Sequence, residues 1–347
     1  MHMADALISP VVGGAMLAAS AGVAGYAIKK VQNELDEQKI PLMGVMGAFV
    51  FAAQMINFAI PATGSSGHLA GGLLLAVLLG PYAGFLTMAS ILIIQALFFA
   101  DGGLLALGCN IFNLGFYASF IAYPLVYKQI VGKDYSSSKI IVGSILAAVV
   151  ALQLGAFSVV LQTLFSGKTA LPFGTFALLM QPIHLAIGVV EGLITAAVIG
   201  FLWKYRPEIL EKTAAGDALG AISIRKVLVG FAIAAVLIGG VFSWFASENP
   251  DGLEWSIYHT SGVEELEAPE GIHQILAAVQ SRIAFLPDYG FKNEEQETME
   301  DAAGKGETWP AVEPGASVSG LVGGMMTMLL AGLTGFGIHI VKRRKRN

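Results

Sequence analysis

Two residues at the start of the chain and one histidine further along carry nitrogen atoms in a pattern that suits a transition-metal ion. A free amine on Met1, the amide nitrogen of His2 and the His2 imidazole Nδ1 can close a five-membered and then a six-membered chelate ring, if the amide deprotonates. Three nitrogens fixed in a plane leave one position open, which His68 in the loop 64–68 could fill. Square-planar nitrogen coordination suits Ni(II) or Cu(II) rather than Zn, Mg or Ca.

A simpler interpretation of the same residues stays open. Every chain starts with Met, a His at position 2 can be without special meaning, and His68 can be a loop side chain that bonds to nearby backbone. The chelate also needs Met1 to remain in place. We expect it to remain, because Met removal generally requires a small second residue and His is bulky.

Three further polar residues are expected at or near the outer face, on the side that carries His2 and His68. They are Gln95, Asp101 and Asn110. Polar groups inside apolar spans are costly and are usually functional or paired. We interpret these three side chains as candidates for orienting a metal-binding imidazole through hydrogen bonds. Helix capping or hydrogen bonding between helices explains each of them equally well.

Composition places the chain in a membrane. Hydrophobic residues make up 55% and charged residues 13% of the sequence, against about a quarter charged in ordinary soluble domains. The mean hydropathy is +0.69. Apolar segments of the kind that cross a bilayer core of ~30 Å as helices recur along the chain. We predict an all-α integral membrane protein with spans at 8–28, 41–61, 69–80, 83–100, 104–127, 140–164, 174–203, 227–246 and 316–340.

Segment 69–80 is too short to cross alone, and Gly80-Pro81 breaks it from the next span.

The basic residues fix the predicted topology: sixteen of the twenty Lys and Arg fall on one side if the N-terminus is outside and the C-terminus cytoplasmic. Residues 1–7 carry no basic residue, which argues against a cleaved signal peptide. The basic tail 342–346 directly follows a span, so we expect it to anchor at lipid headgroups and not to bind nucleic acid.

This layout predicts two domains in a multi-pass protein of the cell membrane. Residues 1–204 form a seven-span unit, 205–226 a cytoplasmic linker, and 227–347 two spans that flank an outer loop at 247–315. That loop holds fifteen of the twenty-five acidic residues and can concentrate cations electrostatically, or it can simply be a soluble, translocated segment.

Two other features of the sequence bear on function. His184 and Glu191 lie seven residues apart on one face of a predicted span, where they could form a proton relay or act as packing contacts between helices. The segment 166–169 looks like the end of a phosphate-binding loop, but Gln162 stands where the first Gly would be. We therefore expect no nucleotide site, no cofactor and no enzymatic activity, so that any ATP hydrolysis comes from a separate subunit.

The sequence resembles the nickel/cobalt substrate-binding component of energy-coupling factor transporters, the NikM/CbiM family. The segments that carry this resemblance are 1–2, 64–71, 79–81, 95–103, 106–112 and 182–185. Residues 227–347 resemble the accessory component NikN through the motifs Pro-Asp-Gly-Leu-Glu-Trp at 250–255 and Leu-Pro-Asp-Tyr-Gly-Phe at 286–291. The resemblance covers nearly the whole chain and indicates a fusion of the two components.

The resemblance implies a ligand set and partners. In that family the metal is held by the terminal amine, the amide and imidazole of residue 2, and a loop His, which correspond to Met1, His2 and His68 here. It implies capture of Ni²⁺ or Co²⁺ at the outer face, with a transmembrane coupling protein and a cytoplasmic ATP-binding cassette ATPase as partners. Ligand chemistry alone does not separate nickel from cobalt. A metal-permeable channel and a membrane metal sensor remain as alternatives, although few polar residues face inward and no signalling domain is visible.

Overall fold

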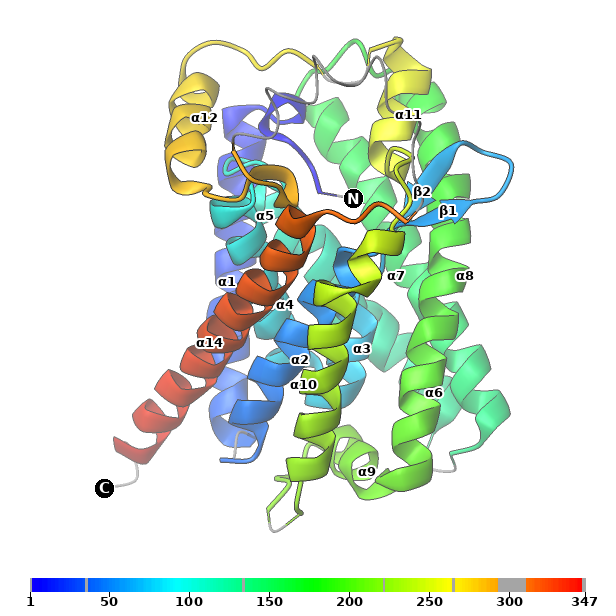
Figure 1. Ribbon diagram of the computed structural model, residues 1–347, viewed down its shortest axis with the longest axis vertical. Helices are drawn as coiled ribbons and strands as arrows, with labels where there is room; N and C mark the ends of the chain where they lie inside the picture. Colours follow the sequence, from blue (N-terminus) through cyan, green and yellow to red (C-terminus); the bar gives the residue numbers. More distant parts are fainter. Residues whose placement is uncertain are drawn as a thin grey trace.

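The computed structural model describes residues 2–34, 37–132, 135–220, 222–263, 266–292 and 310–344. It is almost entirely helical, with one short hairpin (Figure 1). The elements of the first part of the chain are a 3₁₀ turn η1 (Asp5–Leu7), α1 (Pro10–Glu34), α2 (Lys39–Gln54), β1 (Phe58–Ile60), β2 (Ser65–Gly67), α3 (Gly72–Leu79), α4 (Pro81–Phe98), α5 (Leu107–Ile111), the π-helical η2 (Phe112–Tyr127), α6 (Lys128–Val131), α7 (Ser137–Phe165) and α8 (Phe173–Tyr205).

The second part of the chain adds one long helix, α14, the 16-residue helix α10 and several short elements. They are α9 (Pro207–Ala215), α10 (Arg225–Gly240), η3 (Phe242–Phe245), α11 (Gly252–Ser261), α12 (Ile272–Ile283), η4 (Pro287–Tyr289) and α14 (Pro314–Arg344). Both α10 and α14 pack against α2 and against one another, so the second part lies along one side of the first (Figure 1).

Within the described residues, six helices are long and apolar enough to cross a membrane. This confirms the predicted all-α membrane protein. Large apolar side chains such as Val11, 80% exposed, and Leu178, 73% exposed, lie on its outside, as expected of a surface that faces lipid. The predicted break at Gly80-Pro81 separates α3 from α4, because Gly80 has a φ of 87° and Pro81 begins a new helix.

Two predicted spans end earlier than expected. The helix predicted at 227–246 is α10, which ends at Gly240 and is followed by the 3₁₀ turn η3. The segment 41–61 was expected to be helical throughout, but α2 ends at Gln54 and Phe58–Ile60 pairs as a strand with Ser65–Gly67. Hydropathy alone cannot separate a short buried strand from the end of an apolar helix, which explains the error. The difference matters, because the hairpin carries His68 at its end.

Close helix contact depends on glycine where α10 crosses α14. A Cβ on Gly320 would lie 2.6 Å from the Cα of Gly239, so we expect Gly320→Ala to destabilise the fold by about 1–3 kcal/mol. Gly332→Ala, on the same helix with no atom within 4 Å of the new methyl group, should leave stability unchanged or slightly raised. Thermal unfolding in detergent compares the two variants, and equal melting temperatures would contradict this packing argument.

The elements that matter for function gather at one end of the bundle. The N-terminal segment, the β1–β2 hairpin, α11 and α12 all lie at the end opposite the C-terminus (Figure 1). Segments from both parts of the chain therefore meet around His2 and His68.

Candidate metal site

Backbone hydrogen bonds fix the chain immediately after His2. The Met3 N–H donates to Asn110 Oδ1 at 2.8 Å, and the Met3 carbonyl accepts from Asn110 Nδ2 at 3.2 Å and from the Gly103 N–H at 2.9 Å. The Met3 side chain is fully buried. The sequence predicted Asn110 near this site, and it acts on the segment that carries His2 by holding the backbone of Met3. Met1 lies outside the described residues.

The loop that carries His68 is held in place by a buried carboxylate on α8. Glu191 on α8 accepts the N–H groups of Ala70 at 2.9 Å and Gly71 at 3.2 Å. Gly71 has a φ of 78°, a conformation that glycine adopts without a steric penalty. The loop can therefore turn sharply from the hairpin into α3.

Within the described residues, His184 and Glu191 bond to different partners. Its Nδ1 bonds to the carbonyl of Met180 at 2.8 Å, one turn back on the same helix, whereas Glu191 bonds to the His68 loop. The two side chains thus use separate backbone partners. Glu191 anchors the loop, a role that the sequence did not indicate beyond its position in an apolar span.

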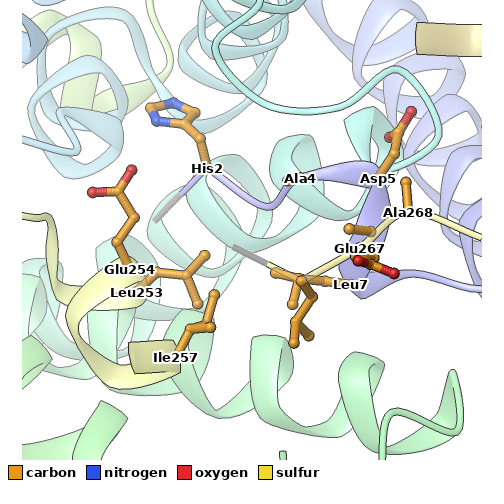
Figure 2. Close-up of a pocket in the computed structure, with 11 residues that line it drawn as sticks. His2, Ala4, Asp5, Leu7, Leu253, Glu254, Ile257, Glu267 and Ala268 are labelled. Carbon is orange, nitrogen blue, oxygen red and sulfur yellow. The ribbon is translucent and has the colours of Figure 1, made fainter. Parts of the chain in front are cut away.

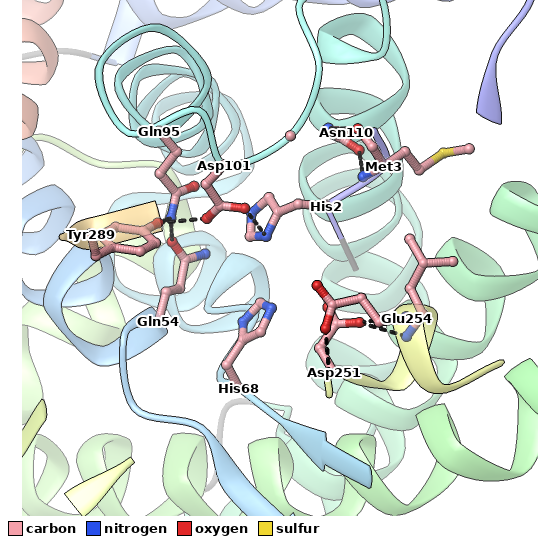
Figure 3. Close-up of polar contacts among 12 residues, drawn as sticks. His2, Met3, Gln54, His68, Gln95, Asp101, Asn110, Asp251, Glu254 and Tyr289 are labelled. Carbon is pink, nitrogen blue, oxygen red and sulfur yellow. Dashed lines mark hydrogen bonds and ion pairs between the residues drawn. The ribbon is translucent and has the colours of Figure 1, made fainter. Parts of the chain in front are cut away.

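The two histidines meet directly (Figure 3). The rings of His2 and His68 are stacked, with centroids 5.2 Å apart and planes inclined by 12°. The His2 Nδ1 lies 3.3 Å from Asp101 Oδ1, while its buried Nε2 has no hydrogen-bond partner among the described residues. Burial lowers the pKa of His2 below its ordinary value and that of His68 to about 3. Neutral imidazoles with lone pairs available are the form that binds a metal ion.

A chain of hydrogen bonds continues from Asp101. The Tyr289 hydroxyl donates to Asp101 Oδ2 at 2.5 Å, and Gln95 Nε2 donates to both Tyr289 Oη at 3.2 Å and Gln54 Oε1 at 3.0 Å. Gln54 Nε2 in turn donates to the carbonyl of Ala70 at 2.9 Å, in the His68 loop. The structure thus places the predicted residues Asp101 and Gln95 near His2 and links them through Tyr289. Gln54 extends the chain to the His68 loop. Neither Tyr289 nor Gln54 was predicted from the sequence.

The segment 249–254, in the second part of the chain, bonds to the β1–β2 hairpin through Ser66. The Ser66 N–H donates to the Pro250 carbonyl at 2.8 Å, and the Ser66 hydroxyl donates to the Asn249 carbonyl at 2.7 Å. Asp251 then caps α11, accepting the N–H of Glu254 at 2.9 Å while Glu254 accepts that of Asp251 at 2.9 Å. This reciprocal cap gives the acidic motif a structural reason and brings Asp251 beside the site.

Two cavities open at His2. One, of about 570 Å³, lies between the N-terminal segment and α11 (Figure 2). The other, of about 420 Å³, also reaches His68. Its lining includes six carboxylate side chains: Asp101, Glu248, Asp251, Glu254, Asp288 and Glu313. Five of these carboxylates belong to the second part of the chain. Acidic residues of the predicted outer loop therefore line the cavity that reaches the two histidines, where their negative charge can attract a cation.

Comparison with known proteins decides the family. Residues 2–209 match the model of the family described as cobalt uptake substrate-specific transmembrane region, CbiM. The chain belongs to the CbiM family. Residues 225–340 match the PDGLE domain, whose name spells the motif at 250–254. The chain therefore joins a CbiM region to a PDGLE domain, as in fused NikMN proteins.

Relatives of this CbiM-family chain are metal transport proteins. It is 36% identical, over 69% of its length and 79% of the relative's, to a protein of Archaeoglobus fulgidus that carries the name "putative fused nickel transport protein NikMN". It is 30% identical to the cobalt transport protein CbiM of Geobacter sulfurreducens, over 78% of this chain and 79% of that one. A crystal structure of a transition metal transporter superposes with a TM-score of 0.53 at 33% identity, covering 61% of this chain and 97% of that one.

Proposed function

We propose that this chain captures Ni²⁺ at the outer face of the cell membrane, as the substrate-binding component of an energy-coupling factor importer. The observation that carries the proposal is the meeting of His2 and His68, with rings stacked 5.2 Å apart at the end of an acidic cavity. The remaining donors in this proposal are the Met1 amine and the His2 amide nitrogen. Together they give the planar nitrogen set that suits Ni(II).

The chelate needs one change from the arrangement observed. Nδ1 of His2 faces Asp101 in the structure, so closing the six-membered ring through Nδ1 requires the imidazole to turn. A ring that binds metal through one nitrogen leaves the other to donate to a carboxylate, the usual arrangement for metal-binding histidines. Asp101 is the carboxylate in contact with this ring.

We propose the remaining roles on the same basis. Residues 1–204 hold the metal, 205–226 are a cytoplasmic linker, and 227–347 assist loading from the outer face. The N-terminus is outside and the C-terminus inside, as supported by the distribution of Lys and Arg. A transmembrane coupling protein and a cytoplasmic ATPase then supply the movement that releases Ni²⁺ inside.

Metal uptake tests this function. Cells that express the chain with its coupling protein and ATPase should accumulate Ni²⁺, and cells with an ATPase that cannot hydrolyse ATP should not. Uptake that is independent of the ATPase would favour the channel. Binding by the purified chain without any uptake in the complete system would favour the sensor.

Acidification is expected to weaken Ni²⁺ binding steeply. Burial keeps the pKa of His68 at about 3, so this imidazole contributes little to proton release in mildly acidic solution. Burial also lowers the pKa of His2, so its imidazole contributes less than an ordinary histidine would. The protons released then come from the Met1 amine, with an ordinary pKa of about 7.7–8.0, and from the His2 amide. Each released proton lowers the affinity about tenfold per pH unit.

Calorimetry between about pH 8 and pH 5.5 should therefore show affinity that falls by about ten- to a hundredfold per unit, for one or two protons released. Binding that stays constant over this range would indicate side-chain ligands alone. That result would remove the amine and the amide from the proposed site.

A further inference from the structure

The segment Leu286–Gly290 of the PDGLE domain adopts a conformation that needs an explanation. Asp288 and Tyr289 follow one another with φ values of 47° and 63°, both in the left-handed region that residues other than glycine rarely occupy. Such strain persists only where surrounding contacts hold it, and it is concentrated at functional sites. The motif was noted in the sequence only as a family signature, with no function attached.

The contacts that hold this segment come mainly from the end of α4. The Asp288 N–H donates to the Phe99 carbonyl at 2.8 Å, and the Leu286 N–H donates to the Phe98 carbonyl at 3.3 Å. The Tyr289 ring stacks on Phe99 with centroids 5.1 Å apart. These contacts attach the PDGLE domain to the backbone just before Asp101.

The strained backbone directs the Tyr289 hydroxyl at Asp101. The phenol donates to Asp101 Oδ2 at 2.5 Å, while the other oxygen, Oδ1, faces His2 Nδ1 at 3.3 Å (Figure 3). Burial and the neighbouring carboxylate raise the pKa of Tyr289 well above its ordinary value, so the phenol keeps the proton that it donates. One oxygen of Asp101 is thus restrained by the PDGLE domain, and the other is turned toward the imidazole.

The same hydroxyl is connected to the second histidine. It accepts from Gln95, which also donates to Gln54, and Gln54 bonds to the Ala70 carbonyl two residues after His68. The phenolic oxygen therefore joins the contact of Asp101 with His2 to the hydrogen bonds that reach the His68 loop. A ring without the hydroxyl would preserve the stacking on Phe99 but would lose the hydrogen bonds to Asp101 and from Gln95.

We propose that Tyr289 is a positioning residue for the metal site: it fixes Asp101 so that this carboxylate can accept a hydrogen bond from the His2 imidazole once the ring has turned to offer Nδ1 to the metal. The inference rests on the proposed function, because it assumes that His2 binds the metal. It gives the PDGLE domain a direct part in the affinity of the site. The partner that orients a ligating histidine commonly contributes about 10–100-fold in metal affinity.

Tyr289→Phe tests this in the full-length chain, with Ni²⁺ as the probe. We expect an affinity at least about tenfold lower by calorimetry and a changed visible absorption spectrum of the bound Ni(II), which reports the geometry of its ligands. Tyr258→Phe removes the hydroxyl of an exposed tyrosine on α11 of the same domain and should leave affinity and spectrum unchanged. Melting temperatures of the metal-free proteins show whether each variant folds.

A second variant separates positioning from packing. If Tyr289 acts through Asp101, adding Tyr289→Phe to Asp101→Asn should weaken binding much less than it does alone, because the two effects share one path. Equal losses in both backgrounds would overturn the proposal. So would a lower melting temperature with unchanged affinity and spectrum, or tighter binding.

Failure of the proposed function and failure of the role of Tyr289 give different results. Wild-type chain that does not bind Ni²⁺ would remove the proposed function and this inference with it. Wild-type chain that binds Ni²⁺ while Tyr289→Phe binds it equally well, with the same spectrum, would remove only the role of Tyr289.

Discussion

Replacing His68 with alanine is expected to abolish high-affinity Ni²⁺ binding and to leave the fold intact. The substitution removes the donor proposed for the fourth position of the plane, and we expect affinity to fall on the order of 10²-fold or more, since each tenfold loss corresponds to about 1.4 kcal/mol. The loop should keep its shape without the imidazole. Its backbone is held by Glu191 on one side and through Ser66 by Pro250 on the other.

His259→Ala is the matched control. His259 is exposed on α11, where its ring stacks on Trp255 with centroids 4.0 Å apart. The same loss of an imidazole there should leave Ni²⁺ binding unchanged. Calorimetry on both purified variants, with melting temperatures to verify folding, decides the point. Unchanged binding by His68→Ala would exclude this residue from the site.

The helical framework could be predicted from sequence because each span carries its own signal. Length and hydropathy identify a membrane helix locally, and Gly80-Pro81 identifies a break without knowledge of its neighbours. The end of α2 could not be found in this way. Residues 55–60 are nearly all apolar, and whether they continue a helix or form a strand depends on a pairing with Ser65–Gly67 across a turn.

The residues of the candidate site also differ in whether the sequence could predict them. Gln95, Asp101 and Asn110 were predictable as polar residues near the ends of apolar spans, and the structure brings all three to His2. Tyr289 was not predictable, because its role arises from a hydrogen bond to a residue 188 positions away. A tyrosine in a polar loop has no periodicity or spacing that indicates which carboxylate it will contact.

Sequence also could not show how the PDGLE domain reaches the metal-site segments. His273 bonds to the Ile8 carbonyl at 2.8 Å, and Gln280 donates to the Gly102 carbonyl at 2.8 Å. With Pro250 on the hairpin, the domain touches the N-terminal segment, the Asp101 loop and the His68 loop. A movement of this domain would therefore act on both histidines together, which suits the loading role proposed for it.

Blocking the N-terminus is expected to have the largest effect on transport. Acetylation of Met1, or an N-terminal tag, turns a basic amine into an amide and removes one donor of the proposed chelate. The structure adds a steric reason, because Met3 is fully buried and its backbone N–H and carbonyl are both bonded to Asn110. A chain extended beyond Met1 cannot shift outward without breaking these bonds. We expect Ni²⁺ uptake to fall to the level of cells that lack the chain, and a C-terminal tag on α14 to be harmless.

Inserting one residue between Met1 and His2 separates binding from transport. The new end still offers an amine, two amide nitrogens and an imidazole, which can complete a plane around Ni²⁺ without His68. The metal would then be held outside the pocket, so we expect the purified insertion variant to bind Ni²⁺ and the same variant in cells to fail in uptake. Normal uptake by an N-terminally tagged chain, with mass spectrometry showing that the tag is intact, would refute the amine as a ligand. The donor set would then have to come from side chains alone.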